Sequence, residues 1–150
     1  MSEIIISEEF SLPVNEITPV AHEASSEGFT FVQRLLDDYA SGENRFDRAG
    51  EALFVAREGP RVVGVCGLNQ DPYSGDARIG RVRRMYVLPS HRAHGTGRRL
   101  LESVTDRATA SFEDLVLRTN DAPAAAFYER CGFKRIEHPT DTTHGKRLEG

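Results

Sequence analysis

Residues 78–108, RIGRVRRMYVLPSHRAHGTGRRLLESVTDRA, contain the pattern that decides the fold of this chain. The stretch opens with apolar residues set among arginines and stops at Pro89, whose missing N–H could not serve a central strand. After two glycines, apolar residues recur at helical spacing at Leu100, Leu101, Val104 and Ala108. The stretch therefore predicts a strand that ends near Val87 and a helix that begins near Gly95.

The junction between this strand and this helix has the composition of an anion site. The first turn of a helix has backbone N–H groups without partners and carries the positive end of the helix dipole, and glycines let an anion approach closely. Gly95 and Gly97 stand at the turn, and Arg92, Arg98 and Arg99 add permanent positive charge. The junction predicts a phosphate-binding loop, with an ordinary strand-to-helix turn as the alternative.

Two common phosphate loops match this junction poorly. The P-loop requires Gly-x-x-x-x-Gly-Lys-Ser/Thr, and no lysine lies near Gly97. The dinucleotide fingerprint requires a third glycine where this chain has Leu100. It also requires an acidic residue after the next strand, whereas Asp114 precedes that strand. The sequence therefore does not contain a P-loop, and it matches the dinucleotide fingerprint poorly.

A third pattern fits better. Residues 87–97 read Val87-x-Pro89-x-x-Arg92-x-x-Gly95-x-Gly97. A second motif contains Asn120, Ala124, Phe127-Tyr128-Glu129-Arg130 and Gly132-Phe133, and Val63-Gly64 precedes both motifs. In order and spacing, these three motifs resemble the GCN5-related N-acetyltransferases (the GNAT family). The resemblance covers roughly residues 53–133.

The resemblance implies direct transfer of an acetyl group from acetyl-coenzyme A (acetyl-CoA) to an amine within a ternary complex. The loop that holds the pyrophosphate in that family, mainly through main-chain groups, corresponds here to Arg92, Ala93, His94, Gly95, Thr96, Gly97 and Arg98. The pantetheine arm is expected to pair with Met85, Tyr86 and Val87, and Asn120 to contact the cofactor. Tyr128 matches the tyrosine that protonates the departing thiolate, with packing beside Phe127 as the alternative role.

Two positions depart from the family pattern. Many members carry a glutamate on the central strand that helps to deprotonate the amine, and the nearest position here is Arg81. A water held by backbone carbonyls, Asp71 or Glu51 could do that work instead. The asparagine that often precedes the tyrosine by seven residues is Asp121 here, so Asn120 and Asp121 are both candidates for that cofactor contact.

Composition is that of one soluble globular domain spanning residues 1–150. Of the 150 residues, 39% are hydrophobic and 28% are charged. No apolar run approaches the ~20 residues of a membrane span, and the start lacks the features of a signal peptide, so a cytoplasmic protein without membrane contact is expected. Cys66 and Cys131 read as small apolar residues. His91 and His94 have no third ligand nearby, so no metal site is predicted.

Charge is distributed unevenly along the chain. Residues 1–51 contain eleven acidic residues and three arginines, whereas the remainder contains 12 acidic and 16 basic residues. A basic remainder suits a polyanionic cofactor, and an acidic first third could attract a cationic partner. Solvated surface charge without a partner is the alternative explanation of the acidic part.

The remaining segments complete a mixed α/β sheet. Strands are expected at residues 4–6, 51–57, 61–68 and 114–118, with a closing hairpin from Phe133–His138 and Thr142–Leu148. Helices are expected at residues 17–24, 29–39 and 123–131. The fold prediction is therefore α/β: one GNAT-like mixed β-sheet flanked by helices, with a splayed parallel strand pair, near Val87 and Asp114, at the cofactor site.

Two other functions fit parts of the sequence. Seven arginines between Arg78 and Arg99 would suit a nucleic-acid-binding module, although the acidic overall balance argues against a nucleic-acid partner. An acyl-CoA-binding sensor without catalytic activity is the second alternative. The acceptor amine, on a small molecule or a peptide, is not identified by the sequence, and a homodimer is expected only by family analogy.

Overall fold

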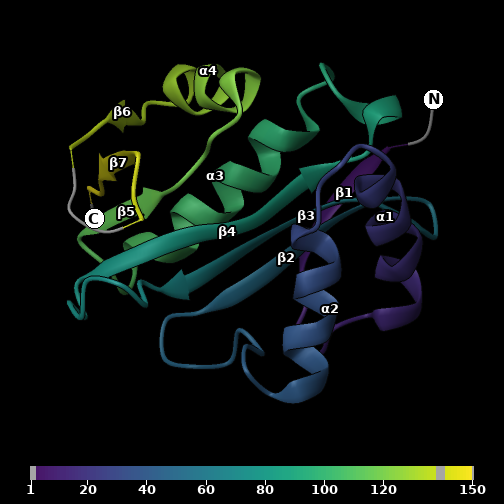
Figure 1. Cartoon of the computed structure of the whole chain (residues 1–150), viewed down its shortest axis with the longest axis horizontal. Coiled ribbons are helices and arrows are strands. Elements are labelled where there is room, and N and C mark those ends of the chain that lie inside the picture. Colours follow the sequence, from purple (N-terminus) through teal and green to yellow (C-terminus); the bar gives the residue numbers. More distant parts are fainter. Residues whose placement is uncertain (1–2, 138–140, 150) are drawn as a thin grey trace.

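The computed structural model describes residues 3–137 and 141–149. Within these residues the chain forms one seven-stranded mixed sheet with helices on both faces (Figure 1). The strands are β1 (Ile4–Glu8), β2 (Ala52–Glu58), β3 (Arg61–Gln70), β4 (Ile79–Val87), β5 (Asp114–Leu117), β6 (Lys134–Arg135) and β7 (His144–Arg147). The helices are α1 (Val14–Ser26), α2 (Phe31–Ser41), α3 (Thr96–Thr109) and α4 (Ala122–Arg130), and a short 3-10 turn spans Pro89–His91.

The strand order is β1-β2-β3-β4-β5-β7-β6, and β4 and β5 form the parallel pair of the sheet. Every other pair of neighbouring strands is antiparallel. The α3 helix supplies the long connection that a parallel pair requires. This arrangement confirms the predicted mixed sheet.

Glycines in the strands let helices and loops lie directly on the sheet. A Cβ at Gly64 would stand 2.9 Å from the side chain of Leu100 in α3, and a Cβ at Gly80 would stand 2.7 Å from Phe112. On the opposite face, a Cβ at Gly67 would overlap the ring of Phe46. The α3 helix therefore covers one face of the sheet, and α1, α2 and the segment after α2 cover the other.

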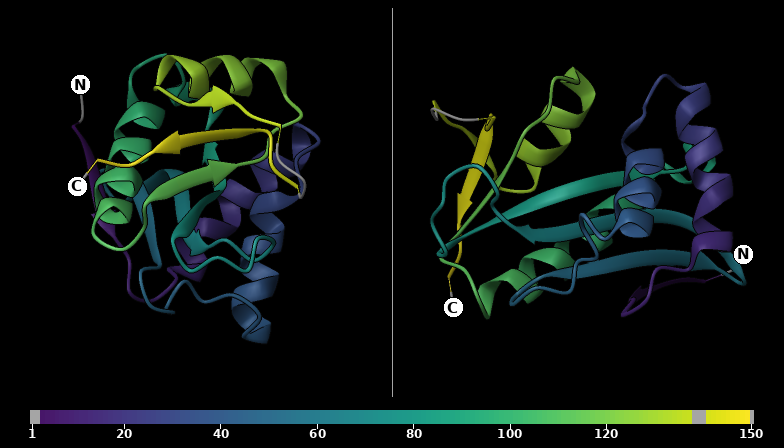
Figure 2. Two further views of the ribbon diagram at one scale, coloured as in Figure 1. Left: turned by 90° about the vertical axis from the view of Figure 1, so that its left-hand side faces the viewer. Right: turned by 60° about the horizontal axis from the view of Figure 1, so that its bottom comes forward.

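The parallel pair separates after three residue pairs. Its register runs from Ile79 opposite Asp114 to Arg81 opposite Val116. Beyond Arg81, β4 continues toward the start of α3 while β5 turns away toward α4, so that the two strands diverge as a V (Figure 2). The predicted splay is confirmed.

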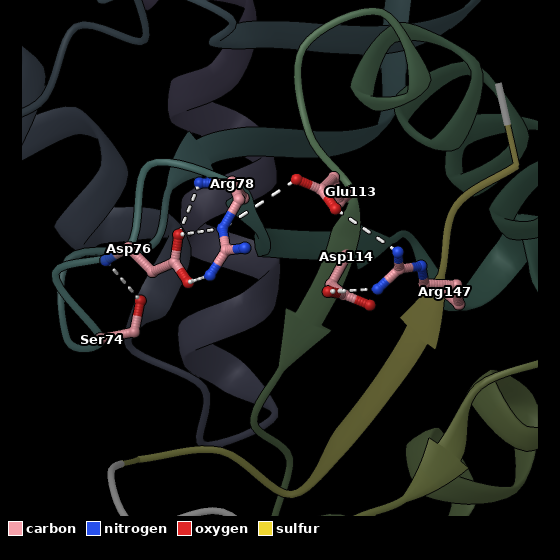
Figure 3. A network of polar contacts seen from close by, with 6 residues as sticks. All are labelled: Ser74, Asp76, Arg78, Glu113, Asp114 and Arg147. Atoms are coloured by element: carbon pink, nitrogen blue, oxygen red, sulfur yellow. Dashed lines mark hydrogen bonds and ion pairs between the residues drawn. The ribbon is translucent and has the colours of Figure 1, made fainter.

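A network of ion pairs joins the segments at the closed end of this V (Figure 3). Arg78, before β4, binds Asp76 at 2.9 Å and approaches Glu113 at 3.9 Å. Arg147 of β7 binds Glu113 at 3.4 Å and Asp114 at 3.5 Å. The backbone carbonyl of Arg78 also accepts a 2.7 Å hydrogen bond from the N–H of Glu113. The two parallel strands are thus held together where they begin.

The ends of the chain differ most from the sequence prediction. The α1 helix extends three residues earlier and two residues later than predicted, and it continues through Pro19, whose ring removes one backbone donor. In the closing hairpin, β6 contains two residues, and the predicted end at His138 lies outside the described residues. Among the described residues, no helix combines the length and apolar character needed to cross a membrane.

Candidate active site

A bulge in β4 interrupts the regular alternation of its side chains between the two faces of the sheet. Gly67 pairs with Arg83 and Val65 with Tyr86, so one residue of β3 stands opposite two of β4, and Arg84 has a φ of 60°. Met85 faces the start of α3, since its Cε would lie 3.3 Å from a Cβ at Gly97. Tyr86 lies on the opposite face, where its ring contacts Phe29 and Phe31.

The loop before α3 has the geometry expected of an anion site. Gly95 caps the helix with a φ of 84°, and a Cβ at this position would meet no atom within 4 Å. Backbone of this shape at a helix N-terminus directs N–H groups outward. There is less free space around Gly97 than around Gly95, because a Cβ at Gly97 would stand 3.3 Å from Met85 and 3.5 Å from Phe127. A side chain at position 97 would therefore press against Met85.

The three arginines around the loop differ in their hydrogen-bond and ion-pair partners. Arg92 forms two hydrogen bonds to the carboxylate of Glu27 in α1, at 2.9 and 2.6 Å, and a third to the carbonyl of Val87. Arg99 donates to the carbonyl of Ile4 at 2.8 Å. Arg98 is exposed and lies 3.6 Å from Glu102. Of the three predicted positive charges, Arg98 is therefore the one left for a ligand at the helix start.

Tyr128 of α4 is buried close to Cys66 of β3 and to Cys131. Its ring packs against Phe127 and Phe133 at centroid distances of 5.3 and 5.8 Å, and the residue is 7% exposed. Among the described residues, no group hydrogen-bonds its hydroxyl. Tyr128 is thus held by its ring contacts, and no described group competes with a ligand for its hydroxyl.

The surroundings of Tyr128 keep it protonated. Burial raises the pKa of Tyr128 above its ordinary value, and the nearby thiols of Cys66 and Cys131 act in the same direction. Burial likewise raises the pKa of the Cys66 thiol. Tyr128 is therefore a neutral hydrogen-bond donor near neutral pH. The raised pKa of Cys66 disfavours its reactive thiolate form.

Asn120 and Asp121, at the start of α4, have different surroundings. The side chain of Asp121 caps the helix by accepting a 3.0 Å hydrogen bond from the N–H of Ala124. Asn120 is exposed at the end of the segment that follows β5. Because Asp121 already has a structural partner, Asn120 is the better placed of the two for a ligand.

The two carboxylates considered as bases are both held by structural partners. Asp71 binds Arg81 at 2.7 Å, and each of these side chains is 3% exposed. Burial alone would raise the pKa of Asp71, but hydrogen bonds from Arg81 and Ser74 outweigh it and lower that pKa. Glu51 accepts hydrogen bonds from Arg48 N, Asn69 Nδ2 and Gln70 N. Neither carboxylate is placed to accept a proton from an amine.

Arg81 connects three segments near the point where β4 and β5 separate. Besides Asp71, it donates to the carbonyl of Asp141 at 2.8 Å and to the hydroxyl of Thr142 at 2.6 Å. The ring of Tyr73 lies 4.7 Å from its guanidinium carbon. Arg81, the position nearest to the glutamate that the family resemblance implies, is therefore a structural connector.

The β4 bulge was not predicted, although the sequence contains a signal for it. Val82 and Met85 are apolar residues of the strand, and an unbroken strand would place them on opposite faces. The three-residue step indicates one extra residue. Contacts between Glu27, Tyr86 and Arg92 have no comparable signal, because 59 residues separate Glu27 from Tyr86.

The V-shaped opening beside β4, with a glycine loop before α3, is the arrangement expected of the GNAT fold. The family model described as "Acetyltransferase (GNAT) domain" matches residues 49–135. The chain belongs to the GNAT acetyltransferase family.

Similar proteins agree with this assignment. The chain is 34% identical over 88 residues to an N-alpha-acetyltransferase RimI of Mycobacterium tuberculosis, and 39% identical over 84 residues to an IAA acetyltransferase of Azospirillum brasilense. It spans about half the length of these curated relatives, 51% and 53%.

Solved structures share the whole fold. A candidate acetyltransferase from Exiguobacterium sp. 255-15 superposes with a TM-score of 0.85 at 32% identity, covering 97% of this chain and 93% of that one. A candidate acetyltransferase from Salmonella typhimurium, solved with its cofactor acetyl-CoA, has a TM-score of 0.68 at 15% identity, covering 97% and 94%. The second comparison supports the fold alone.

Proposed function

We propose that the protein is an N-acetyltransferase that moves an acetyl group from acetyl-CoA to the amine of an acceptor within a ternary complex. The observation that supports this proposal is the separation of β4 from β5 beyond Arg81, with the glycine loop before α3 beyond the end of β4. The opening exposes one side of the β4 backbone to a ligand that enters between the strands.

The residues predicted to bind the cofactor have separate roles in this proposal. The backbone from Arg92 to Arg98 holds the pyrophosphate, and the backbone at Met85, Tyr86 and Val87 pairs with the pantetheine arm. Asn120 adds a side-chain contact from the opposite wall. Acetyl-CoA supplies an activated thioester, whose carbonyl carbon is attacked by the amine as the carbon–sulfur bond breaks.

Tyr128 stabilises the departing thiolate by donating a hydrogen bond from its hydroxyl group. A raised pKa makes complete transfer of that proton unfavourable in the ground state. A hydrogen bond from a neutral phenol needs no complete transfer, and it strengthens as negative charge develops on sulfur. The acceptor's proton passes to water, because Asp71 and Glu51 are held by other groups.

A thiol-release assay with acetyl-CoA and a panel of amines tests this function. The panel contains small amines, polyamines, amino acids and peptides, and acetylated products are confirmed by mass spectrometry. Cofactor binding by calorimetry without turnover of any amine would favour the acyl-CoA sensor instead. A homodimer and a cytoplasmic location stay predictions that gel filtration and localisation in cells would test.

The nucleic-acid alternative has less support from the geometry. Arginines of the 78–99 stretch form ion pairs with carboxylates of the same chain, including Asp76, Asp71, Asp38 and Glu27. These partners reduce the positive field that a phosphate backbone would require. DNA affinity across a salt series provides the test, and tight binding with a steep salt slope would restore this alternative.

A further inference from the structure

On the α2 side of β4, three arginines lie close to one another, and one of them pairs with a carboxylate. Arg84 projects from the bulge toward Asp38 of α2, at 3.3 Å. Arg83 and Arg34 lie close enough that their positive charges help to lower the pKa of Arg84, after burial, which is the larger cause. Neither Arg83 nor Arg34 has an ion pair with another described residue. This group, Arg34, Arg83 and Arg84, is therefore short of negative charge.

The Arg84 side chain is unusual for a charged group. It is 8% exposed, and its Nε is buried without a hydrogen-bond partner among the described residues. Its backbone has a φ of 60°, a region that non-glycine residues rarely adopt. A buried guanidinium with one long ion pair and an unmatched donor costs stability, and such costs persist where a function uses them.

The position of Arg84 relates it to the proposed chemistry. On β3, Cys66 stands opposite the bulge, and Cys66 is close enough to Tyr128 to affect its pKa. Tyr128 and Arg84 thus lie at the same level of β4, on opposite faces of the sheet. In the proposed complex, an acceptor on the α1 and α2 face would lie near Arg84, across β4 from Tyr128.

Given the proposed transferase function, on which this step rests, we infer that the acceptor carries a carboxylate in addition to its amine, and that Arg84 binds this carboxylate with support from Arg83. The planar guanidinium matches the two oxygens of a carboxylate, and Arg34 adds positive charge at the entrance. Free amino acids and peptides with an acidic first side chain both provide this chemistry.

Matched acceptors provide the kinetic test. Each amino acid is compared with its carboxamide, and each peptide that begins with Asp or Glu is compared with the same peptide beginning with Asn or Gln. A charge-assisted hydrogen bond contributes about 1.5–3 kcal/mol, so kcat/KM should favour the carboxylate by about 10- to 100-fold. The first set of pairs tests free amino acids and the second tests peptides.

Variants link the preference to this arginine. Arg84→Gln should remove most of the difference between the matched acceptors, while Arg84→Lys should keep part of it and acetyl-CoA affinity should be unchanged. Arg135→Gln, at an exposed arginine in β6, is the control and should leave the preference intact. Loss of acetyl-CoA affinity in Arg84→Gln would assign the arginine to the cofactor and overturn the inference.

A second measurement separates this inference from the proposed function. Calorimetry with the CoA-saturated protein measures binding of the same carboxylates and carboxamides without turnover. If acetyl-CoA is never consumed but carboxylates bind more tightly in an Arg84-dependent manner, the transferase function fails and the anion site stands. If carboxamides bind and react as well as carboxylates, the inference is wrong while the transferase function stands.

Discussion

Tyr128 is the one side chain to which we assign a direct chemical role. Because its hydroxyl would act mainly when charge develops on sulfur, Tyr128→Phe should lower kcat by about 10²–10⁴-fold and leave acetyl-CoA affinity nearly unchanged. Phenylalanine preserves the ring contacts with Phe127 and Phe133. Steady-state kinetics and calorimetry on the two proteins provide the measurement, with Tyr39→Phe in α2 as the control.

The pH dependence of Tyr128 refines this prediction. A phenol with an ordinary pKa would lose its proton near pH 10, and the rate would fall there. Burial raises the pKa of Tyr128, so the wild-type rate should show no such decline within the range where the protein is folded. If Tyr128→Phe reacts at the wild-type rate, the tyrosine is a packing residue and water protonates the thiolate.

Arg81 and Arg78 are three residues apart and should contribute very differently to stability. Arg81→Met would leave Asp71 buried without its cation, at a cost of about 3–5 kcal/mol. The Arg78 side chain is 69% exposed, so Arg78→Met should cost less than about 1 kcal/mol. Urea unfolding of both variants measures the difference. Equal effects would show that Asp71 reaches water when Arg81 is removed.

At the scale of elements, the loop before α3 gives a test of cofactor binding. Gly97→Leu would direct a side chain toward Met85 and Phe127, into the space where a phosphate approaches the backbone. Acetyl-CoA affinity, measured by calorimetry, should fall at least tenfold, about 1.4 kcal/mol. Asp106→Leu adds the same side chain at an exposed position of α3 and should not change affinity. Unchanged affinity in a folded Gly97→Leu protein would remove the phosphate from this loop.

Elements that depend on local pattern were predicted well from the sequence. The strand ending at Val87, the loop and the α3 helix are all specified by residues within one short stretch. The α1 helix was predicted too short because the stretch with Pro13 read as irregular, whereas packing of Ile17, Val20 and Ala21 in the core maintains a longer helix that continues through Pro19. Local preference was outweighed there by tertiary contacts.

The candidate site was predicted only where its residues lie on motifs. The glycine loop and Tyr128 belong to motifs with fixed spacing. By contrast, the arginine group joins α2 to β4, and 46 residues separate Asp38 from Arg84. Sequence periodicity contains no information about such distant partners. The same limit applied to Glu51 and Asp71, whose structural partners became visible only in the folded chain.

At the scale of the whole molecule, the uneven charge of the chain is partly matched internally. Ion pairs link acidic residues of the first 51 positions to arginines of the remainder: Glu8 to Arg107, Glu9 and Glu16 to Arg57, Glu27 to Arg92, and Asp38 to Arg84. The acidic first third therefore holds α1, α2 and β1 against the rest of the sheet. A cationic partner is not needed to explain it.

These ion pairs predict how stability responds to acid. Hydrogen bonds from Arg92 and Tyr86 lower the pKa of Glu27 below its ordinary 4.5, and the hydrogen bond from Arg57 does the same for Glu16. The unfolded chain then binds more protons than the folded chain, so this stabilisation is complete above about pH 4.5 and is lost as the pH falls through the folded values. Urea midpoints measured between pH 6 and pH 3 should decrease accordingly.

A variant tests whether the Glu27 contacts cause part of this decrease. Glu27→Gln should be less stable than wild type at neutral pH, and the two proteins should converge toward pH 3. Glu102→Gln, at an exposed position of α3, should follow the wild-type curve. Parallel curves for wild type and Glu27→Gln would place the acid sensitivity in other carboxylates.

Because β4 separates early from β5, part of β4 has a free strand edge although it lies in the middle of the sheet. Beyond Arg81, β4 has a strand neighbour on the β3 side and none on the other side among the described residues. Exposed strand edges have backbone N–H and C=O groups without partners, and they invite pairing with other chains. The amides of β4 that face away from β3 should therefore exchange their hydrogens with deuterium quickly in the free protein and slowly once acetyl-CoA is added.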